Sequence, residues 1–583
     1  MNRANFIPPR KPKSRNRRGF ALIFLFIAIA AAVFYFWYVY AYGPVETRVE
    51  PDYGSEKPIF YRGELMDGSA LGTGDSLKLP LPVVQSVMDP NIVYEEASAS
   101  LILATANHVV RLQTDQLNAW VNERPFELRF PTEVTESGAV YVPIEPLERF
   151  YGAEIREDES TGIVRLRMPG DVTAWAEVPP DEKADDQVTV AVRSAPSIRA
   201  GIVGELAAGA RVEVWGERDG WYYVQLSSGI VGYADKQSLQ WSGAEPYEPE
   251  QDNPAVPYVP KRPMGERIIL TWEQVYTGTP NPDTFGPMPG LNVVSPTWFH
   301  LLDGEGALEN RADANYVRWA HERDIQVWAL FSNSFDPDRT KEAMSTYERR
   351  MNMARQLLSW AALYELDGIN IDFENVHLED GPKLTQFVRE LTPLLHEAGL
   401  IVSIDVTFIS TSPNWSMFYD RSALGGIVDY VVVMAYDEHW ASSPVAGSVA
   451  SLPWVEQGVR RMIEETDIPP AKLILGVPFY ARVWTEAPSE GGVKVSSQAV
   501  GMDVVDRILR EEKLTPVVDA QTGQHYVEYE HESGFRKIWI EDEMSMRARA
   551  ELVKELGLAG VGAWSRGFEQ EEIWGIIDDV LSP

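Results

Sequence analysis

Carboxyl and amide side chains recur at every second position of one short apolar segment. Asn370, Asp372 and Glu374 alternate with apolar residues within 366–375. This period of two is typical of a β-strand that has one apolar and one polar face. The three polar side chains are therefore expected to point to the same side of the strand, where two carboxyl groups and an amide lie together.

The segments on either side predict that this strand is buried. Apolar residues recur with helical spacing in Tyr347–Tyr364 before it and in 382–398 after it. Strands that alternate with helices form parallel sheets covered on both faces. A carboxylate is costly to bury there unless it has a function. We therefore favour a catalytic role over an exposed edge strand or a structural ion pair.

The spacing of the two carboxyl groups points to a particular hydrolytic chemistry. Asp372 and Glu374 would stand about 6 to 7 Å apart along one strand face. Neighbouring carboxylates repel, so one keeps its proton and can act as a general acid. Ordinary glycosidases place their two carboxylates on opposite sides of the scissile bond. A pair on one side fits better a mechanism in which the 2-acetamido oxygen of the substrate attacks the anomeric carbon.

The segment Asp367-Gly-Ile-Asn370-Ile-Asp372-Phe-Glu374 resembles the DxxDxDxE signature of glycoside hydrolase family 18, which lies on the fourth strand of a (β/α)8 barrel. The family most often has Asp where this chain has Asn370. The branch of spore-cortex and cell-wall N-acetylglucosaminidases commonly has Asn there, so the resemblance implies peptidoglycan as substrate. The proton partner of Asp372 stays open.

A second segment, Met434-Ala-Tyr436-Asp437, is similar to the MxYD element on the sixth strand of that family. The resemblance implies that the Tyr436 hydroxyl hydrogen-bonds the acetamido carbonyl of the substrate. It also implies that Asp437 positions the sugar and that Met434 lines the pocket.

Three further residues match family positions near the substrate. Trp564 ends the eighth expected strand, and the resemblance implies that its ring forms the floor under the reacting sugar, since apolar sugar faces stack on aromatic rings. Tyr480 and Arg482 match weaker positions. Each of these residues alone is also explained by packing, and their order along one barrel is what makes the set informative.

Residues 265–583 are expected to form the catalytic (β/α)8 barrel. The eight candidate strands are 267–271, 293–298, 326–331, 368–373, 401–406, 430–434, 473–477 and 560–564. A small α+β insertion is expected at 483–542, where Trp484 and Trp539 are candidate substrate contacts; Trp440 is another. Chemistry in such barrels collects at the C-terminal ends of the strands.

Composition excludes several classes of partner and site. The chain has 583 residues, too many for one core, so several domains are expected. Its net charge of -34 argues against nucleic acid and against an anionic membrane surface as partners. It has no cysteine, which excludes disulfides and thiolate chemistry.

The first residues predict a membrane anchor. Residues 1–18 are rich in Arg and Lys and form an expected cytoplasmic tail, whereas 19–42 carry no charge. The uncharged run is long enough to span the hydrocarbon core, and its aromatic end suits the membrane interface. We expect a single-pass protein with its bulk extracellular. Secretion after signal-peptide cleavage is the alternative.

The middle of the chain is expected to hold two small domains and three connecting segments. The α+β segment 91–170 resembles the copper amine oxidase N-terminal-like domain, without implying copper, and 187–242 resembles a bacterial SH3-type barrel that binds cell wall. The connecting segments are a connector at 43–90 with a strand at 81–87, a linker at 171–186 and a Pro-rich linker at 243–264.

The fold class expected is thus a TIM barrel with an α+β insertion, preceded by an all-β SH3-like barrel, a small α+β domain and a transmembrane helix. The function expected is cleavage of β-1,4 bonds at N-acetylglucosamine in peptidoglycan by substrate-assisted retaining catalysis. Neither metal nor cofactor is required. The alternatives are a chitinase, a lectin-like barrel that binds glycan without cutting it, and a metal-dependent enzyme with Asp372 and Glu374 as ligands.

Overall fold

The computed structural model describes residues 17–180, 189–249, 258–262, 267–489 and 492–582. They fall into two compact units. The first unit is Met1–Met88 with Tyr141–Gln251, and the second is Asp89–Val140 with Asp252–Pro583.

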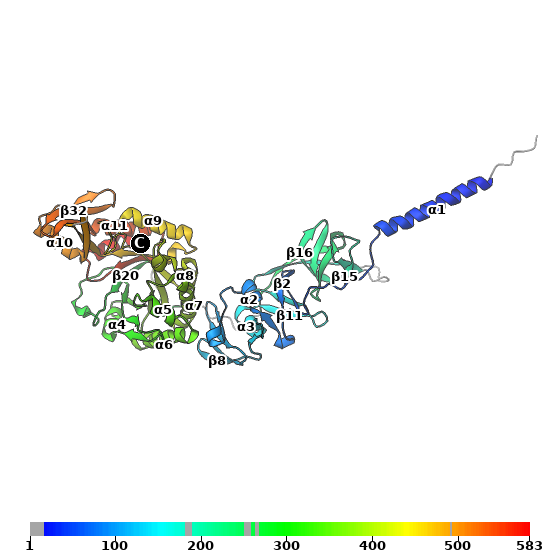
Figure 1. Cartoon of the computed structure of the whole chain (residues 1–583), viewed down its shortest axis with the longest axis horizontal. Helices are drawn as coiled ribbons and strands as arrows, with labels where there is room; N and C mark the ends of the chain where they lie inside the picture. Colours follow the sequence, from blue (N-terminus) through cyan, green and yellow to red (C-terminus); the bar gives the residue numbers. More distant parts are fainter. Residues whose placement is uncertain (1–16, 181–188, 250–257, 263–266, 490–491, 583) are drawn as a thin grey trace, which may run out of the picture. The chain divides into compact units, whose positions relative to one another are not determined.

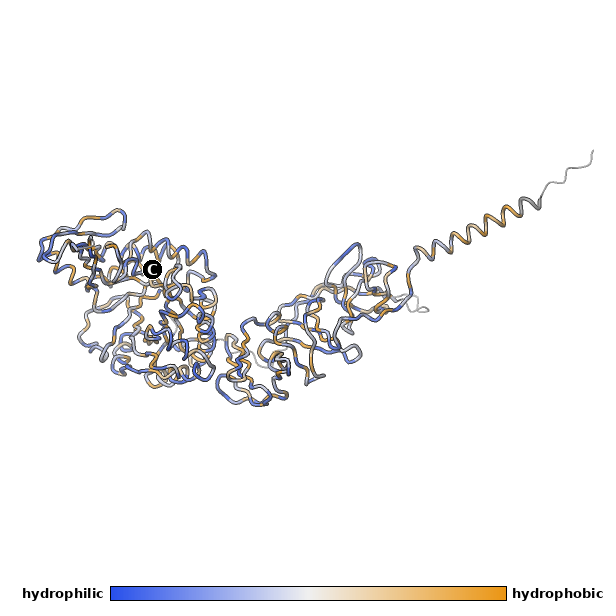
Figure 2. Tube along the Cα trace, viewed as in Figure 1, coloured by the Kyte–Doolittle hydropathy of each residue, from blue (hydrophilic) through white to orange (hydrophobic). Residues whose placement is uncertain are grey.

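Helix α1 (Arg17–Tyr42) begins the described chain. Its segment Leu22–Tyr42 has 21 residues with a mean hydropathy of 2.5, and none of it is buried against protein. The apolar character continues along the helix (Figure 2). A helix of this length spans about 32 Å, enough to cross a bilayer core. The basic tail expected before it lies largely outside the described residues.

The first unit contains a small sheet that the sequence did not predict as a whole. The order of the sheet is β11 (Glu154–Glu157), β12 (Val164–Arg167), β1 (Pro58–Tyr61) and β2 (Glu64–Ser69). Beside it, β3 (Lys78–Pro80) pairs with β10 (Val140–Pro143), and α3 spans Ile144–Tyr151.

The expected connector at 43–90 is therefore wrong where β1 and β2 form a hairpin. The strand expected at 81–87 is also wrong, because Leu81–Val87 is helix α2. A proline in the first turn favours a helix start. Leu81, Val83 and Val84 are buried on one side of that helix, and these apolar neighbours resemble a short strand when read without their partners.

An all-β barrel completes the first unit, as expected. Its strand order is β15 (Ile202–Ala207), β14 (Thr189–Arg193), β18 (Val231–Asp235), β17 (Trp221–Gln225), β16 (Arg211–Arg218), β13 (Val172–Glu177) and β19 (Gln240–Pro246). Val192, Val212 and Val224 lie in its core. Strand β13 lies inside the segment expected as a linker, where it pairs with β16 and β19.

The second unit begins with a five-stranded antiparallel sheet. Its order is β4 (Val93–Glu95), β5 (Ser100–Ala104), β6 (Val109–Gln113), β7 (Asn118–Val121) and β8 (Arg124–Glu127). This sheet contacts the barrel through Arg350, which bonds Glu95 of β4 at 3.1 Å and Glu390 at 2.7 Å.

Eight parallel strands close into the expected barrel (Figure 1). They are β20 (Ile268–Glu273), β21 (Val293–Pro296), β24 (Gln326–Ser332), β25 (Gly368–Asp372), β26 (Ile401–Thr407), β27 (Tyr430–Met434), β28 (Leu473–Pro478) and β34 (Gly560–Trp564). Closure comes from the pairing of β20 with β34 and of β21 with β24. Each of the eight strands overlaps one of the candidate segments expected from the sequence.

Helices and a short hairpin surround these strands. The helices are α4 (Ala314–His321), α5 (Pro337–Ala343), α6 (Tyr347–Tyr364), α7 (Gly381–Glu397), α8 (Arg421–Ile427), α9 (Leu452–Glu465), α11 (Glu543–Leu556) and α12 (Glu572–Leu581). The hairpin is β22 (Phe299–Leu301) with β23 (Leu308–Asn310).

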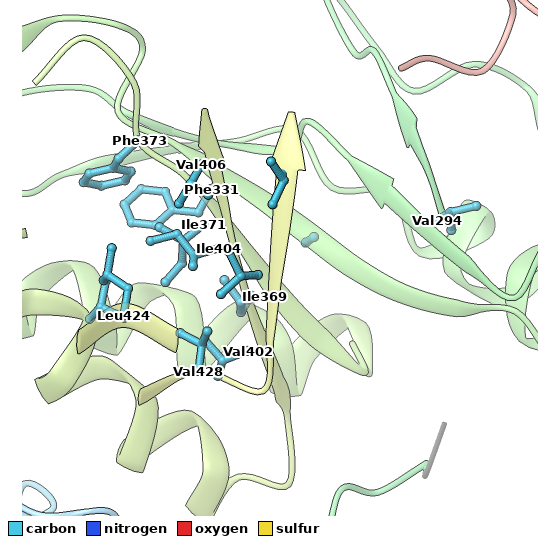
Figure 3. Packing of buried hydrophobic residues seen from close by; sticks show 14 of the residues in the cluster. Val294, Phe331, Ile369, Ile371, Phe373, Val402, Ile404, Val406, Leu424 and Val428 are labelled. Carbon is cyan, nitrogen blue, oxygen red and sulfur yellow. The ribbon is translucent and has the colours of Figure 1, made fainter. Parts of the chain in front are cut away.

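Alternate residues of the strands belong to two different cores. Ile369 and Ile371 lie in the outer core with Ile404 and with Leu424 of α8 (Figure 3). The inner core, inside the barrel, holds Ile268, Leu270, Trp272, Val293, Trp328, Leu330, Ile401, Val432, Ile474 and Ala559. Because strand side chains alternate, residues 370 and 372 face the interior.

The α+β insertion lies where it was expected, between β28 and β34. It consists of β29 (Tyr480–Ser489), β30 (Gly492–Gly501), α10 (Met502–Glu511), β31 (Val517–Asp519), β32 (Gln524–His531) and β33 (Gly534–Ile540). Trp484 is fully buried there and its indole N–H donates to the Gly447 carbonyl at 2.8 Å. The expectation that Trp484 contacts substrate is therefore wrong.

Candidate active site

Asp372 ends β25 at the C-terminal mouth of the barrel. Its side chain is buried, and Oδ1 has no hydrogen-bond partner among the residues that the structure describes. Burial raises the pKa of Asp372 to about 7. A buried carboxylate oxygen without a partner is unusual in a folded protein. It is an acceptor ready for the N–H group of a ligand.

Glu374 follows Asp372 just beyond the end of the strand. Burial raises its pKa well above the ordinary glutamate value, and the nearby carboxyl groups of Asp372, Asp405 and Asp437 raise it further. The charge of Asp372 is one of the causes that raise the pKa of Glu374, so an ionised Asp372 favours a protonated Glu374. That combination is the one a general acid and its anionic neighbour require.

The backbone of Glu374 is held by an amide that the sequence did not single out. Asn333, fully buried after β24, donates from Nδ2 to the Glu374 carbonyl at 2.7 Å and accepts the Glu374 N–H on Oδ1 at 3.1 Å. Asn333 Nδ2 also bonds Thr340 at 3.0 Å. An asparagine in a loop carries no distinctive sequence signal, so only the fold could identify this clamp.

Asn370 occupies a different place from the one expected. It is fully buried, and its Oδ1 accepts from Trp272 Nε1 at 3.0 Å and from Ser295 Oγ at 3.1 Å. Its Nδ2 donates to Ser403 Oγ at 3.0 Å and to Asp405 Oδ1 at 2.7 Å. The amide is saturated by protein groups, so Asn370 is a positioning residue below the site and not a substrate contact.

Asp405 is a third buried acid, and the sequence reasoning missed it. It lies on β26 with 1% of its surface exposed. The signal was present, because Ser403 and Asp405 alternate with apolar residues in Ile401–Thr407 as Asn370 and Asp372 do in β25. The sequence does not show that β25 and β26 pair, so it could not place Asp405 beside Asp372.

Tyr436 and Asp437 follow β27 on the neighbouring side of the mouth. Burial raises the pKa of Tyr436 well above the ordinary tyrosine value, and the nearby Asp405 and Glu374 raise it further. The hydroxyl therefore stays protonated and can donate a hydrogen bond.

Asp437 has a φ of 60°, a left-handed conformation uncommon outside glycine. Its Oδ1 accepts from the Tyr480 hydroxyl at 2.7 Å and lies 3.3 Å from an Arg482 nitrogen. Nearly half of the Asp437 side chain remains exposed, so its second oxygen stays accessible to a ligand.

Trp564 ends β34 and is only partly buried, with its ring centroid 5.7 Å from that of Trp272. Met434, at the end of β27, is buried. Apart from Asn370, the expected site residues thus lie at or just beyond the C-terminal ends of β25, β27, β28 and β34.

Exposed aromatic side chains occupy loops that follow the same strand ends. Tyr276, Phe335, Trp415 and Trp440 are all exposed, and they follow β20, β24, β26 and β27. Phe335 and Trp415 face each other with centroids 6.4 Å apart. Of these four, only Trp440 was expected from the sequence to be a candidate substrate contact. Aromatic faces of this kind are suited to stack against sugar rings.

The carboxyl groups of the site do not form a metal-binding cluster in the part of the chain that the structure describes. Within the described ranges, no group of three or more His, Cys, Asp or Glu side chains is arranged to hold a metal ion. The three carboxyl groups at the barrel mouth are spread over β25 and β26, and their amide and indole neighbours are hydrogen-bond donors.

Comparison with known families gives three matches in different parts of the chain. Residues 298–569 match the family model of glycosyl hydrolases family 18. Residues 188–240 match the bacterial SH3 domain, and residues 62–166 match the copper amine oxidase N-terminal domain.

Three curated proteins show how far the similarity extends. An uncharacterized glycosylase, YvbX of Bacillus subtilis, is 26% identical over 296 residues, covering 49% of this chain and 83% of that protein. The cortical fragment-lytic enzyme of Bacillus subtilis is 28% identical over 243 residues, covering 40% and 54%. The di-N-acetylchitobiase of Rattus norvegicus is 26% identical over 266 residues, covering 39% and 71%.

The family 18 match runs from β22 to β34, so it includes the site residues on β25, β26, β27 and β34 but not the first two barrel strands. The matched part spans about half the length of the cortical fragment-lytic enzyme. The barrel of this chain is a glycosyl hydrolase family 18 domain, joined in one polypeptide to a bacterial SH3 domain and a copper amine oxidase N-terminal domain.

Proposed function

We propose that the protein hydrolyses β-1,4 bonds at N-acetylglucosamine in peptidoglycan, with the acetamido group of the substrate as nucleophile and with retention of anomeric configuration. The observation that carries this proposal is the pair Asp372 and Glu374. One is a buried carboxyl with an unpartnered oxygen, and the other is an acid whose pKa is raised well above the ordinary value. Both lie on one side of the barrel mouth.

In the first step, Glu374 donates its proton to the glycosidic oxygen and the leaving sugar departs. The acetamido carbonyl oxygen attacks C1 and forms an oxazolinium ion. Asp372 accepts the hydrogen bond of the acetamido N–H, and its negative charge stabilises the positive charge that develops on that group. The protonated Tyr436 hydroxyl orients the carbonyl oxygen.

In the second step, water opens the oxazolinium ring. The Glu374 carboxylate takes a proton from the water, whose oxygen forms the new bond to C1. The ring bond to the acetamido oxygen breaks, the N-acetyl group is restored, and Glu374 again carries a proton. Two inversions at C1 give net retention.

The remaining residues bind the sugar. The partly exposed ring of Trp564 is placed to stack beneath it, and Asp437, fixed by Tyr480 and Arg482, offers an acceptor to a sugar hydroxyl. Met434 lines the pocket.

Peptidoglycan is favoured by the rest of the chain. The bacterial SH3 domain match supports attachment to cell wall, and a cortical fragment-lytic enzyme is among the similar proteins. Helix α1 is long and apolar enough to anchor the protein, with the basic tail inside and the chain after Gly43 outside. Chitin-type oligosaccharides are the second candidate, because a di-N-acetylchitobiase is also similar to the barrel.

A Glu374→Gln variant tests the catalytic assignment. Glutamine keeps the size of the side chain but has no proton to donate, so turnover of peptidoglycan or chitin oligosaccharide should fall by roughly three to four orders of magnitude. Glu555→Gln, an exposed position on α11, is the matched control and should keep full turnover. Turnover near that of the wild type in Glu374→Gln would refute the assignment.

A further inference from the structure

The proposed mechanism gives no role to Asp405, a buried acid on β26 beside the site. Asp405 is almost wholly inaccessible, and in the described part of the chain no Lys or Arg forms an ion pair with it. Burying a carboxylate without a cation is costly, and such groups commonly remain neutral instead. The position of Asp405 therefore calls for an explanation.

Strand pairing brings Asp405 beside Asp372. Strands β25 and β26 are parallel, with Asn370 opposite Ser403 and Ile371 opposite Ile404. Asp372 and Asp405 are the next residues of the two strands, whose backbones lie about 4.8 Å apart. Ile371 and Ile404 both belong to the outer core, so the two aspartates both face the barrel interior.

Asn370 fixes the orientation of Asp405. Two donors, Trp272 Nε1 and Ser295 Oγ, point at Asn370 Oδ1, which forces Nδ2 to face β26. There Nδ2 donates to Asp405 Oδ1 at 2.7 Å. One oxygen of Asp405 is thereby occupied as an acceptor, and the Trp272 side chain is a second hydrogen-bonding neighbour of this carboxyl group. An aspartate at position 370 would instead set two carboxyl groups against each other.

The groups around Asp405 are predominantly acidic. Asp372 lies beside it on β25 and Glu374 lies beyond the end of that strand, while the hydroxyls of Tyr419 and Tyr436 approach from the loops before α8 and after β27. Burial raises the pKa of Asp405 well above the ordinary range, and the charge of Asp372 raises it further. Adjacent carboxyl groups in such surroundings retain a proton between them.

We propose that Asp405 and Asp372 form an acidic pair across β25 and β26, in which Asp405 holds the proton and donates it as a hydrogen bond to the Asp372 carboxylate. Asp405 is then a positioning residue. It keeps Asp372 anionic and oriented to receive the acetamido N–H, and in that respect the inference rests on the proposed function. Asn370 supports this arrangement, because its amide donates to Asp405 and fixes the orientation of that carboxyl group.

Three variants of the full chain in detergent test the pair. Asp405→Asn preserves both hydrogen bonds, because its carbonyl can accept from Asn370 and its N–H can donate to Asp372. Asp405→Ala removes the donor. Asp367→Asn is the matched control, since Asp367 is a buried aspartate at the opposite end of β25 that contacts His321 and Arg262.

The first measurement is infrared absorption of protonated carboxyl groups at pH 8, which does not depend on activity. The band should be weaker in Asp405→Asn than in the wild type and unchanged in Asp367→Asn. An unchanged band in Asp405→Asn would mean that Asp405 is ionised, and that result would overturn the pair whatever the substrate proves to be.

The second measurement is the pH dependence of kcat/KM on a soluble N-acetylglucosamine tetramer. In Asp405→Ala, kcat should fall about 100-fold and the acid limb should move to higher pH, because the Asp372 carboxylate has lost its donor. Asp405→Asn should restore kcat to within about tenfold of the wild type, with an acid limb near that of the wild type.

The outcomes distinguish a failure of the acidic pair from a failure of the proposed function. Equal losses in the two Asp405 variants, without movement of the acid limb, would reduce Asp405 to a structural role. A large shift of the acid limb to lower pH in Asp405→Asn would show that a negative charge had been removed, and would likewise overturn the assignment. A wild-type protein inactive on every glycan would contradict the proposed function, while the infrared result would still decide the pair.

Discussion

Replacing Asp372 with asparagine should make the protein inactive and yet more stable at alkaline pH. Burial raises the pKa of Asp372 from an ordinary value of about 3.9 to about 7. The native state therefore binds a proton that the unfolded chain releases between these two values. Stability falls as the pH rises through this window and is level above it.

The size of the effect follows from the two pKa values. At pH 8 the wild type bears the whole cost of ionising Asp372 in the folded protein, at most about 4 kcal/mol. At pH 5 the cost is about 1.5 kcal/mol. Asp372→Asn removes this cost, so its stability relative to the wild type should increase by roughly 2.5 kcal/mol between pH 5 and pH 8.

The assay is denaturant unfolding at pH 5 and pH 8, followed by tryptophan fluorescence. Five of the largest buried side chains are tryptophans, and all five lie in the second unit with the barrel. Asp367→Asn is the control, and it should lose stability at both pH values because it breaks the contact with His321. A stability difference between Asp372→Asn and the wild type that does not depend on pH would refute the electrostatic reasoning.

Two further predictions concern the clamp and the anchor. Asn333→Ala removes both hydrogen bonds to the Glu374 backbone. In steady-state kinetics, kcat should fall about 10- to 100-fold while KM changes little. An unchanged kcat would show that these two hydrogen bonds are dispensable. When the full chain is expressed in a bacterium, it should stay in the membrane pellet after an alkaline carbonate wash, because α1 is long and apolar enough to span the membrane. Recovery of the protein in the medium without residues 1–42 would instead identify a cleaved signal peptide.

Much of the barrel was predictable because its strands carry strong local patterns. The alternation of Asn370 and Asp372 with Ile369 and Ile371 reflects the two cores on either side of β25. Each core demands apolar residues at a fixed period, so a strand can be recognised without its neighbours.

The misjudged residues depend on contacts distant in sequence. Asn370 was expected to touch substrate, but bonds from Trp272 and Ser295 on two other strands hold it below the site. Trp484 was expected in the groove, but it packs inside the junction of the insertion with the barrel. Asp405 acquires meaning only when β26 is placed beside β25.

The analysis of products from purified peptidoglycan and from N-acetylglucosamine tetramer tests the central claim most directly. Wild-type protein should release new reducing ends at N-acetylglucosamine, with the β-anomer formed first as retention requires, and Glu374→Gln should release none at a comparable rate. Tight binding to the wall without products from either form would contradict catalysis, and initial formation of the α-anomer would contradict the substrate-assisted mechanism.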